Sequence, residues 1–271
     1  GGAKEAEEGR WRIRSLSLLL LLPASCGPSP GPVGAGVPAC NPTTGLSAPL
    51  PTCTAANPCT RLAAELGDKP IVTPVVVPEC KATDPYAPPF DDGPPLVWTD
   101  PAGVDRHACL FRPLGASAAS PRPLVVWLHG GGAGVASNVY DFTWIRQKAE
   151  SYDLTGDPSR PGFLLVSVQG RSLHYPTGNP RDGHHHDFYY RDLGAPSTNP
   201  DIANVDRIVD QLSASGAVDR SRIYLMGWSN GGYFGQMYAI ARHARPTPGG
   251  NRVAAAAVFT AADPFHNTSP N

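Results

Sequence analysis

The chain has 271 residues, of which 29 are glycine and 31 are proline. Their combined share of the chain is far above the roughly 12% that these two residue types average in proteins. Its 22 basic and 23 acidic residues give a net charge of −1, which excludes a basic footprint for nucleic acid and an acidic tail. The absence of a G-x-y period excludes collagen, and the absence of an apolar run of about 18 residues excludes a multi-span membrane protein.

Residues 1–26 are typical of a secretory signal. Three arginines precede an apolar stretch that ends in the leucines at 18–22, and small residues follow it. The stretch is too short to cross a bilayer. Because the two methionines, Met226 and Met237, are both internal, we expect the sequence to be incomplete at its start.

Cys26 leaves two outcomes open for the exported chain. It follows Ala-Ser, which resembles a bacterial lipoprotein cleavage site at which the cysteine thiol takes the lipid. Pro23 stands where such sites usually have leucine. The protein is therefore predicted to be bacterial and either secreted or anchored at the outer cell surface by a lipid on Cys26.

Residues 27–95 are rich in Pro, Gly and Thr and show little periodicity, which predicts an extended tether. Within it we expect a short helix at 61–66 and an edge strand at 71–77. The export signal favours disulfides over metal thiolates for the six cysteines. The sequence has no C-x2-C pair, which argues against a zinc site. Cys80 with Cys109 is one candidate bridge, although spacing does not fix the connectivity.

Residues 96–271 are predicted to form one folded domain. An antiparallel hairpin is expected from 96–99 and 108–111. Continuous apolar runs, typical of strands buried on both faces, lie at 124–128, 163–168, 223–226 and 253–259.

Helices are expected between these strands. One is predicted at 141–151 and another at 229–244. A third has Asn199 as its N-cap, Pro200 as its first residue and Gly216 as its stop. Strands that alternate with helices predict an α/β fold with a mainly parallel sheet flanked by helices.

The sequence Gly-Trp-Ser-Asn-Gly at 227–231 matches G-x-S-x-G. An apolar strand precedes it and a helix follows it, as a nucleophile elbow requires. The predicted elbow lifts the Ser229 hydroxyl above the sheet at a helix N-terminus, where free N–H groups favour developing negative charge. Glycine is expected to be required at Gly227 and Gly231, because neighbouring backbone passes too close to leave room for a side chain.

His-Gly-Gly-Gly at 129–132 follows the earlier buried strand. In this architecture such a loop supplies one N–H of an oxyanion hole, and the residue after the nucleophile supplies the other. These donors would be Gly131, or Gly130, and Asn230. His129 precedes the nucleophile, so it is expected to hold the loop by hydrogen bonds rather than to act as the base.

The segments PLVVWLHGGGAG and DRSRIYLMGWSNGG, with NVDRIVDQL between them, resemble secreted polyhydroxybutyrate depolymerases and feruloyl or acetyl-xylan esterases. The clear part of the resemblance lies within 123–232 and a weaker match extends over 96–262. It implies an α/β-hydrolase fold and a serine ester hydrolase that acts through an acyl-enzyme. It also implies an acid and then a histidine that follow the nucleophile.

Few residues after Ser229 can complete this machinery. Asp263 is the one acid and a weak candidate, while the histidines are His243 and His266. His243 would lie about 20 Å along the helix from Ser229, and His266 is only three residues from Asp263. We therefore expect that the last strands, the true acid and the base lie beyond Asn271, and that the 271-residue chain by itself is inactive.

His184, His185, His186 and Asp187 form a second cluster. A solvated loop is our first interpretation, and a substrate-cleft lining with Tyr189 and Tyr190 is the second. A metal site is the weakest, because consecutive side chains diverge on any regular element. We expect neither a metal nor a cofactor.

Three hypotheses follow for the function. The first is a secreted serine esterase with a polymeric ester as its substrate. The second is a non-catalytic surface lipoprotein that uses the same fold as a binding module. The third, a serine peptidase, is disfavoured because no second domain fits in the remaining length. The loops at 171–200 carry no readable code for the ester.

Overall fold

The structure is a computed structural model, and all the residues it describes belong to the compact unit 51–271. The described residues are 79–100, 103–132, 134–173, 183–188, 195–243, 252–261 and 264. The predicted signal, Cys26 and the elements expected at 61–66 and 71–77 lie outside them. No helix in these described ranges is long and apolar enough to cross a membrane.

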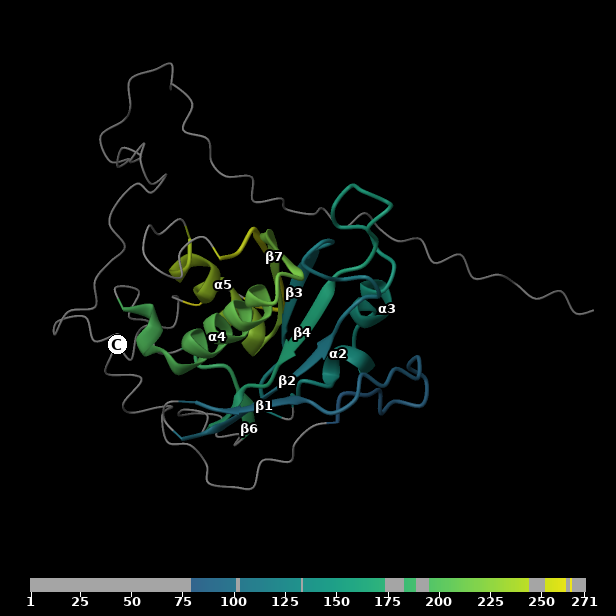
Figure 1. Cartoon of the computed structure of the whole chain (residues 1–271). Helices are drawn as coiled ribbons and strands as arrows, with labels where there is room; N and C mark the ends of the chain where they lie inside the picture. The colour runs from purple at the N-terminus through teal and green to yellow at the C-terminus, as the bar shows by residue number, and fades with distance from the viewer. Residues whose placement is uncertain are drawn as a thin grey trace, which may run out of the picture. The chain divides into compact units, whose positions relative to one another are not determined.

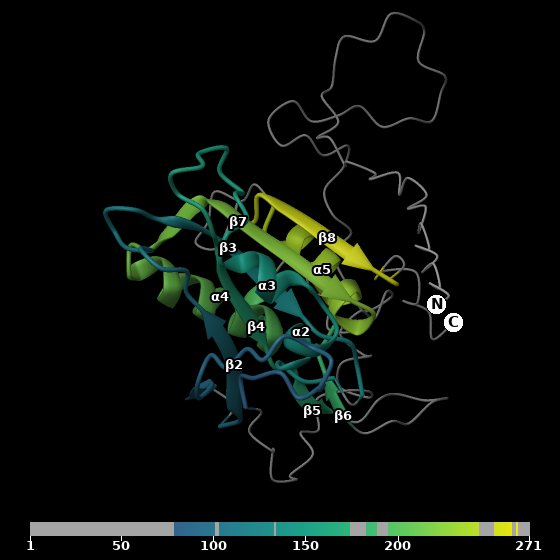
Figure 2. The ribbon, with the colours of Figure 1, turned by 90° about the vertical axis from the view of Figure 1, so that its right-hand side faces the viewer.

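Six strands form one mixed sheet in the order β1-β2-β4-β3-β7-β8 (Figure 1, with β8 labelled in Figure 2). Their bounds are β1 Leu96–Thr99, β2 Asp105–Phe111, β3 Arg122–Leu128, β4 Leu164–Val168, β7 Val218–Trp228 and β8 Ala255–Phe259. A second, two-stranded sheet consists of β5 (Arg171–Leu173) and β6 (Gly183–His185). The expected hairpin and all four apolar runs are therefore strands of one sheet.

The sheet is antiparallel at one edge and parallel elsewhere. β2 runs antiparallel to both β1 and β4, which confirms the hairpin. The strands β4, β3, β7 and β8 are parallel neighbours. Their carboxyl ends therefore lie at one edge, where the loops after β3 and β7 meet. Crossover helices connect these strands, as a parallel sheet requires.

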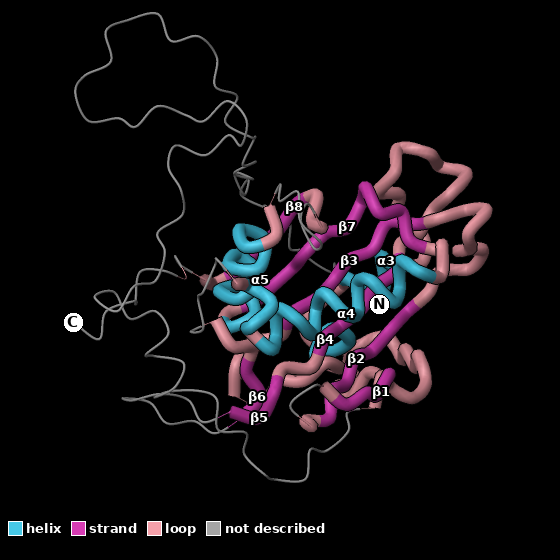
Figure 3. Tube along the Cα trace, turned by 60° about the vertical axis from the view of Figure 1, so that its left-hand side comes forward, coloured by secondary structure: helices cyan, strands magenta, loops and turns pink. Residues whose placement is uncertain are grey.

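Helices cover both faces of the sheet (Figures 2 and 3). The short helices α2 (Asn138–Asp141) and α3 (Ile145–Ala149) lie on one face. The longer α4 (Pro200–Ala214) and α5 (Asn230–Ala241) lie on the other, and the 3-10 turn η1 (Pro196–Thr198) precedes α4. The predicted α/β fold with a mainly parallel sheet is confirmed.

The single helix expected at 141–151 is wrong, because the chain forms α2 and α3 with a break between them. The Thr143 hydroxyl donates to the Val139 carbonyl at 2.6 Å and accepts from the Ile145 N–H at 3.2 Å. This hydroxyl competes with the backbone ladder, which is the usual reason that threonine favours helix ends. The break leaves Phe142 and Trp144 exposed.

The beginning of α4 is as the sequence predicts. The Asn199 side chain accepts hydrogen bonds from the N–H groups of Asp201 and Ile202, and Pro200 is the first helical residue. Such a cap stabilises a helix by about 1 kcal/mol. After the helix, Gly216 adopts a φ of 73°, the left-handed geometry of a helix stop.

The core between the sheet and helices α2 and α3 includes a disulfide. Cys80 and Cys109 are bonded and each is 1% exposed, so this candidate bridge is confirmed. They pack with alternate residues of β3, Val125 and Trp127, and with Tyr140. The bridge ties the end of the expected tether to strand β2.

The described end of the tether, 79–95, packs on the domain through a buried ion pair. The Asp92 carboxylate accepts from Arg146 at 2.7 Å and from the Tyr140 hydroxyl at 2.8 Å. The guanidinium of Arg146 also lies over the rings of Phe90 and Phe111. Charge pairing and cation–π contact thus hold this segment against α3.

Candidate active site

Ser229 lies in a sharp turn between β7 and α5. Its φ of 52° and ψ of −118° are strained for a residue with a side chain. Its N–H donates to the Phe259 carbonyl at 2.9 Å, and its own carbonyl accepts from Gly232 and Tyr233 at the start of α5. The predicted strand–turn–helix is therefore present, with a half-buried serine at its apex.

Two glycines make this turn sterically feasible. A Cβ on Gly227 would lie 2.3 Å from the Gly231 carbonyl oxygen. A Cβ on Gly231 would lie 2.2 Å from the Leu128 carbonyl oxygen. Both clashes involve backbone, so the expectation that backbone passes close to these glycines is confirmed.

The glycine-rich loop after β3 lies beside the turn. A Cβ on Gly131 would be 3.2 Å from the Asn230 Cβ, so these two residues are direct neighbours. Gly131 is exposed, and Asn230 is the first residue of α5, whose N–H has no acceptor within the helix. The arrangement places the backbone of Gly131 beside the first residue of α5, one position after Ser229.

His129 holds the glycine-rich loop, as predicted. Its Nδ1 lies 2.6 Å from the Gly130 carbonyl oxygen, and its Nε2 accepts from the Gly170 N–H at 2.9 Å. The ring is fully buried. Burial and then the neighbouring His186 lower the pKa of His129 well below its ordinary value, so the ring is neutral at pH 7.

The interpretation of the histidine cluster as a solvated loop is wrong. His184 and His185 lie on β6, and His185, His186 and Asp187 are at most 5% exposed. The Asn230 side chain accepts from the His186 N–H at 2.7 Å and donates to the His186 carbonyl at 3.1 Å. Partners from a distant segment satisfy the polar backbone here, which allows it to be buried.

The alternative of a cleft lining stays a prediction, because Tyr189 and Tyr190 lie outside the described residues. For the metal alternative, the described residues contain no group of three or more His, Cys, Asp or Glu that could hold an ion. Burial lowers the pKa of His186 to about 4, against the opposing charge of Asp201. The ring stacks on Phe234 with centroids 5.3 Å apart.

A buried charge network supports the histidine segment from behind. Asp201 pairs with Arg106 and lies 3.8 Å from Arg171, and its carboxylate accepts from the Asp187 N–H at 2.6 Å. Burial alone would raise the pKa of Asp201, but Arg106 and Arg171 outweigh it and hold the pKa at about 2. The Asp201 carboxylate is therefore ionised across the physiological pH range.

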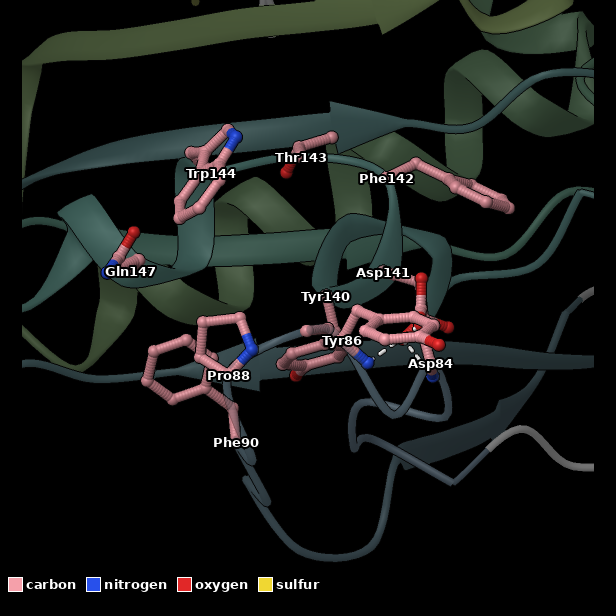
Figure 4. A pocket seen from close by; sticks show the side chains of 11 residues that line it. Asp84, Tyr86, Pro88, Phe90, Tyr140, Asp141, Phe142, Thr143, Trp144 and Gln147 are labelled. Atoms are coloured by element: carbon pink, nitrogen blue, oxygen red, sulfur yellow. Dashed lines mark hydrogen bonds between the residues drawn. The ribbon is translucent and has the colours of Figure 1, made fainter. Parts of the chain in front are cut away.

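An exposed aromatic residue, Trp228, directly precedes Ser229, and a second exposed ring lies beside it. Trp228 is 40% exposed, and its ring lies 6.3 Å from that of Phe142, which is 66% exposed. Phe142 and Trp144 also line a pocket of about 140 Å³ with Tyr86 and Tyr140 (Figure 4). An aromatic surface thus extends from the residue before Ser229 to this pocket.

The other residues considered from the sequence lie apart from the turn or outside the described ranges. Asp263 and His266 belong to the second group. The exposed His243 follows the end of α5 at Ala241, which agrees with the large separation from Ser229 expected along the helix.

Sequence reasoning missed Arg106, Arg171 and Asp201 altogether. Charged residues are seldom fully buried, so nothing local in the sequence indicates such a network. The one available signal is Asp201 in the first turn of a helix whose cap was recognised.

The order of these features decides the fold class. The glycine-rich loop follows parallel strand β3, and the G-x-S-x-G turn joins parallel strand β7 to α5. The chain has an α/β-hydrolase fold.

Comparisons with known proteins add the following. No protein-family model matches this chain, and no curated protein matches it. Solved structures similar to it include the thermophilic esterase Est2 from the planctomycete Thermogutta terrifontis, with 17% identity and a TM-score of 0.38 over 65% of this chain and 54% of that one.

Two further similar structures are an esterase and a hydrolase. An acetyl xylan esterase from Paenibacillus sp. R4 has 20% identity and a TM-score of 0.37, over 56% of this chain and 45% of that one. A puromycin hydrolase has 21% identity and a TM-score of 0.36, over 65% of this chain and 23% of that one. The matched regions thus span between about a quarter and about half of these proteins.

Proposed function

We propose that this protein is a serine ester hydrolase that acts through an acyl-enzyme. The observation that carries the proposal is the Ser229 turn, with its positive φ and with Gly131 directly beside Asn230. Such a turn exposes a serine hydroxyl next to two unpaired backbone donors, which is the arrangement needed to stabilise a tetrahedral oxyanion.

In the proposed reaction the Ser229 oxygen attacks the ester carbonyl carbon and its proton passes to a general base. The negative charge that develops on the carbonyl oxygen is held by the N–H groups of Gly131 and Asn230, each worth about 3 kcal/mol of barrier. The alcohol leaves with a proton from the base. Water then attacks the acyl-enzyme, which releases the acid and regenerates the hydroxyl.

Asp263, which follows β8, stays the candidate acid. Neither His129, which is bound within its own loop, nor His243, beyond the end of α5, is proposed as the base.

We further propose that the substrate is a polymeric ester, such as a polyester or an esterified plant polysaccharide. The aromatic side chains of Trp228, Phe142 and Trp144 support this proposal, because exposed rings beside a nucleophile suit a long chain that lies across the surface. The resemblance to secreted polyhydroxybutyrate depolymerases and feruloyl or acetyl-xylan esterases points the same way. Export through residues 1–26, with or without a lipid on Cys26, belongs to this proposal.

The proposal is tested by hydrolysis of p-nitrophenyl butyrate in the full-length natural protein. Replacement Ser229→Ala is expected to lower kcat at least a thousandfold. The matched control is Ser221→Ala, an exposed serine earlier on the same strand, which is expected to leave kcat unchanged. Equal activity of Ser229→Ala and the parent protein would refute the proposal and favour a non-catalytic binding module.

A further inference from the structure

The segment 183–188, which begins with strand β6, contacts both halves of the proposed oxyanion hole. At one end the His184 N–H donates to the Gly132 carbonyl at 2.8 Å, in an isolated bridge with the glycine-rich loop. At the other end, the two hydrogen bonds of the Asn230 amide hold the backbone of His186. Two backbone residues of one short segment are thus attached to the two elements that carry the donors.

Between these attachments, the side chain of His185 packs directly on Gly131. A Cβ at Gly131 would lie 2.5 Å from Nδ1 and 2.7 Å from Cε1 of this imidazole. The ring is 5% exposed. It therefore limits how far the glycine-rich loop can move toward β6.

The segment is itself fixed by buried partners. The Asp187 N–H donates to Asp201, and the Asp187 carbonyl accepts from the Asn199 amide at 2.8 Å. On its other side β6 pairs with β5, where Arg171 is opposite His185. These contacts join the segment to α4 and to the buried charge network, so it is held at a defined position.

We propose that the segment 183–188 is a brace that sets the separation of the Gly131 and Asn230 N–H groups, and that the Asn230 side chain is its principal positioning contact. The inference rests on the proposed ester hydrolysis. Oxyanion donors act only at about 2.7–3.1 Å from the developing charge, and a displacement of about 1 Å can cost a hundredfold in rate. In this proposal Asn230 has two separate tasks: its backbone N–H faces the substrate, and its side-chain amide holds the backbone of His186, directly after β6.

The test is Asn230→Ala, which keeps the backbone N–H and removes both amide hydrogen bonds. The expected result with p-nitrophenyl butyrate is a fall in kcat of about 10- to 100-fold with KM changed less than threefold, because the donors act on the transition state. The matched control is Asn204→Ala, a buried asparagine that accepts from the Trp98 indole. It is expected to lower Tm without changing kcat.

A second readout does not depend on turnover. In the full-length natural protein labelled with ¹⁵N, Asn230→Ala is expected to shift the Gly131 amide signal and to speed exchange of the His186 amide at least tenfold. Asn204→Ala is expected to change neither.

These outcomes separate the two proposals. An unchanged kcat in an active Asn230→Ala enzyme, or an unchanged Gly131 signal, would overturn the brace. A parent protein no more active than Ser229→Ala would overturn the ester hydrolase, while the amide measurements would still decide whether the brace exists.

Discussion

Replacement Gly231→Ala tests the close contact on which the Ser229 turn depends. The added Cβ would lie 2.2 Å from the Leu128 carbonyl oxygen and 2.5 Å from that of His129. Ordinary carbon–oxygen contacts are about 3.3 Å or longer, so α5 and the end of β3 would have to separate by about 1 Å. Both sides of the contact are backbone, which cannot rotate away as a side chain can.

The expected loss in free energy of unfolding is therefore at the upper end of the range measured for overpacked cores. Inserting a methyl group into a well-packed site costs about 1–3 kcal/mol and occasionally more. We expect Gly231→Ala to lower the free energy of unfolding by about 3 kcal/mol or more. Ser229, two positions before Gly231, already has a strained positive φ, which leaves the turn little freedom to adjust.

Gly235→Ala is the matched control, because it makes the same change one turn later in α5. Its Cβ would lie 3.3 Å from the Leu128 Cδ1 and 3.8 Å from the Val258 Cγ1, both side-chain ends. Helix propensity favours alanine over glycine by about 1 kcal/mol, so the net change should stay within about 1 kcal/mol. Urea denaturation followed by circular dichroism measures both variants. Equal free energies of unfolding for the two would refute the steric reasoning.

Three further predictions concern stability. The pKa of His186 is about 4 in the folded chain and ordinarily 6.5, so between these pH values only the unfolded chain takes up the proton. As the pH drops from 6.5 to 4, this group should therefore lower the free energy of unfolding by about 3 kcal/mol. A free energy of unfolding from urea denaturation that does not change with pH would contradict this. Asp201→Asn removes the nearer carboxylate of the buried Arg106 and leaves Asp100 at 3.7 Å as its remaining anionic partner. The loss should be about 3 kcal/mol at pH 7 in the same assay, whereas a surface ion pair is worth less than about 1 kcal/mol. Replacing Cys80 and Cys109 together by alanine opens a loop with a sequence separation of 29, and the thermal unfolding should show a loss of about 3–4 kcal/mol, whereas an unchanged Tm would count against the bridge.

The parts of the fold that could be predicted are those whose signal is local. The apolar run at 124–128 can only be a strand or a buried helix, and its length and the glycines after it favour the strand. Asn199-Pro200 is a cap because the amide oxygen and the missing N–H both suit a helix start. The glycines at 227 and 231 are explained by the turn that the motif demands.

The parts that could not be predicted depend on partners far away in the sequence. The polarity of the segment from His184 to Asp187 suggests exposure to solvent. Its burial is favourable because groups distant in the sequence, such as the amide of Asn230 and the carboxylate of Asp201, bond to its backbone. The break between α2 and α3 is closer to predictable. It arises because the Thr143 hydroxyl competes with the helix backbone for hydrogen bonds. The spacing of apolar residues carries no information about this competition.

Trapping of the acyl-enzyme tests the central claim most directly. The full-length natural protein is mixed with p-nitrophenyl butyrate, quenched in acid during turnover, digested, and mapped by mass spectrometry. The account predicts one butyryl group on the peptide that contains Ser229, and none in the Ser229→Ala variant. Turnover with no acylated peptide, or with the acyl group on another residue, would contradict it.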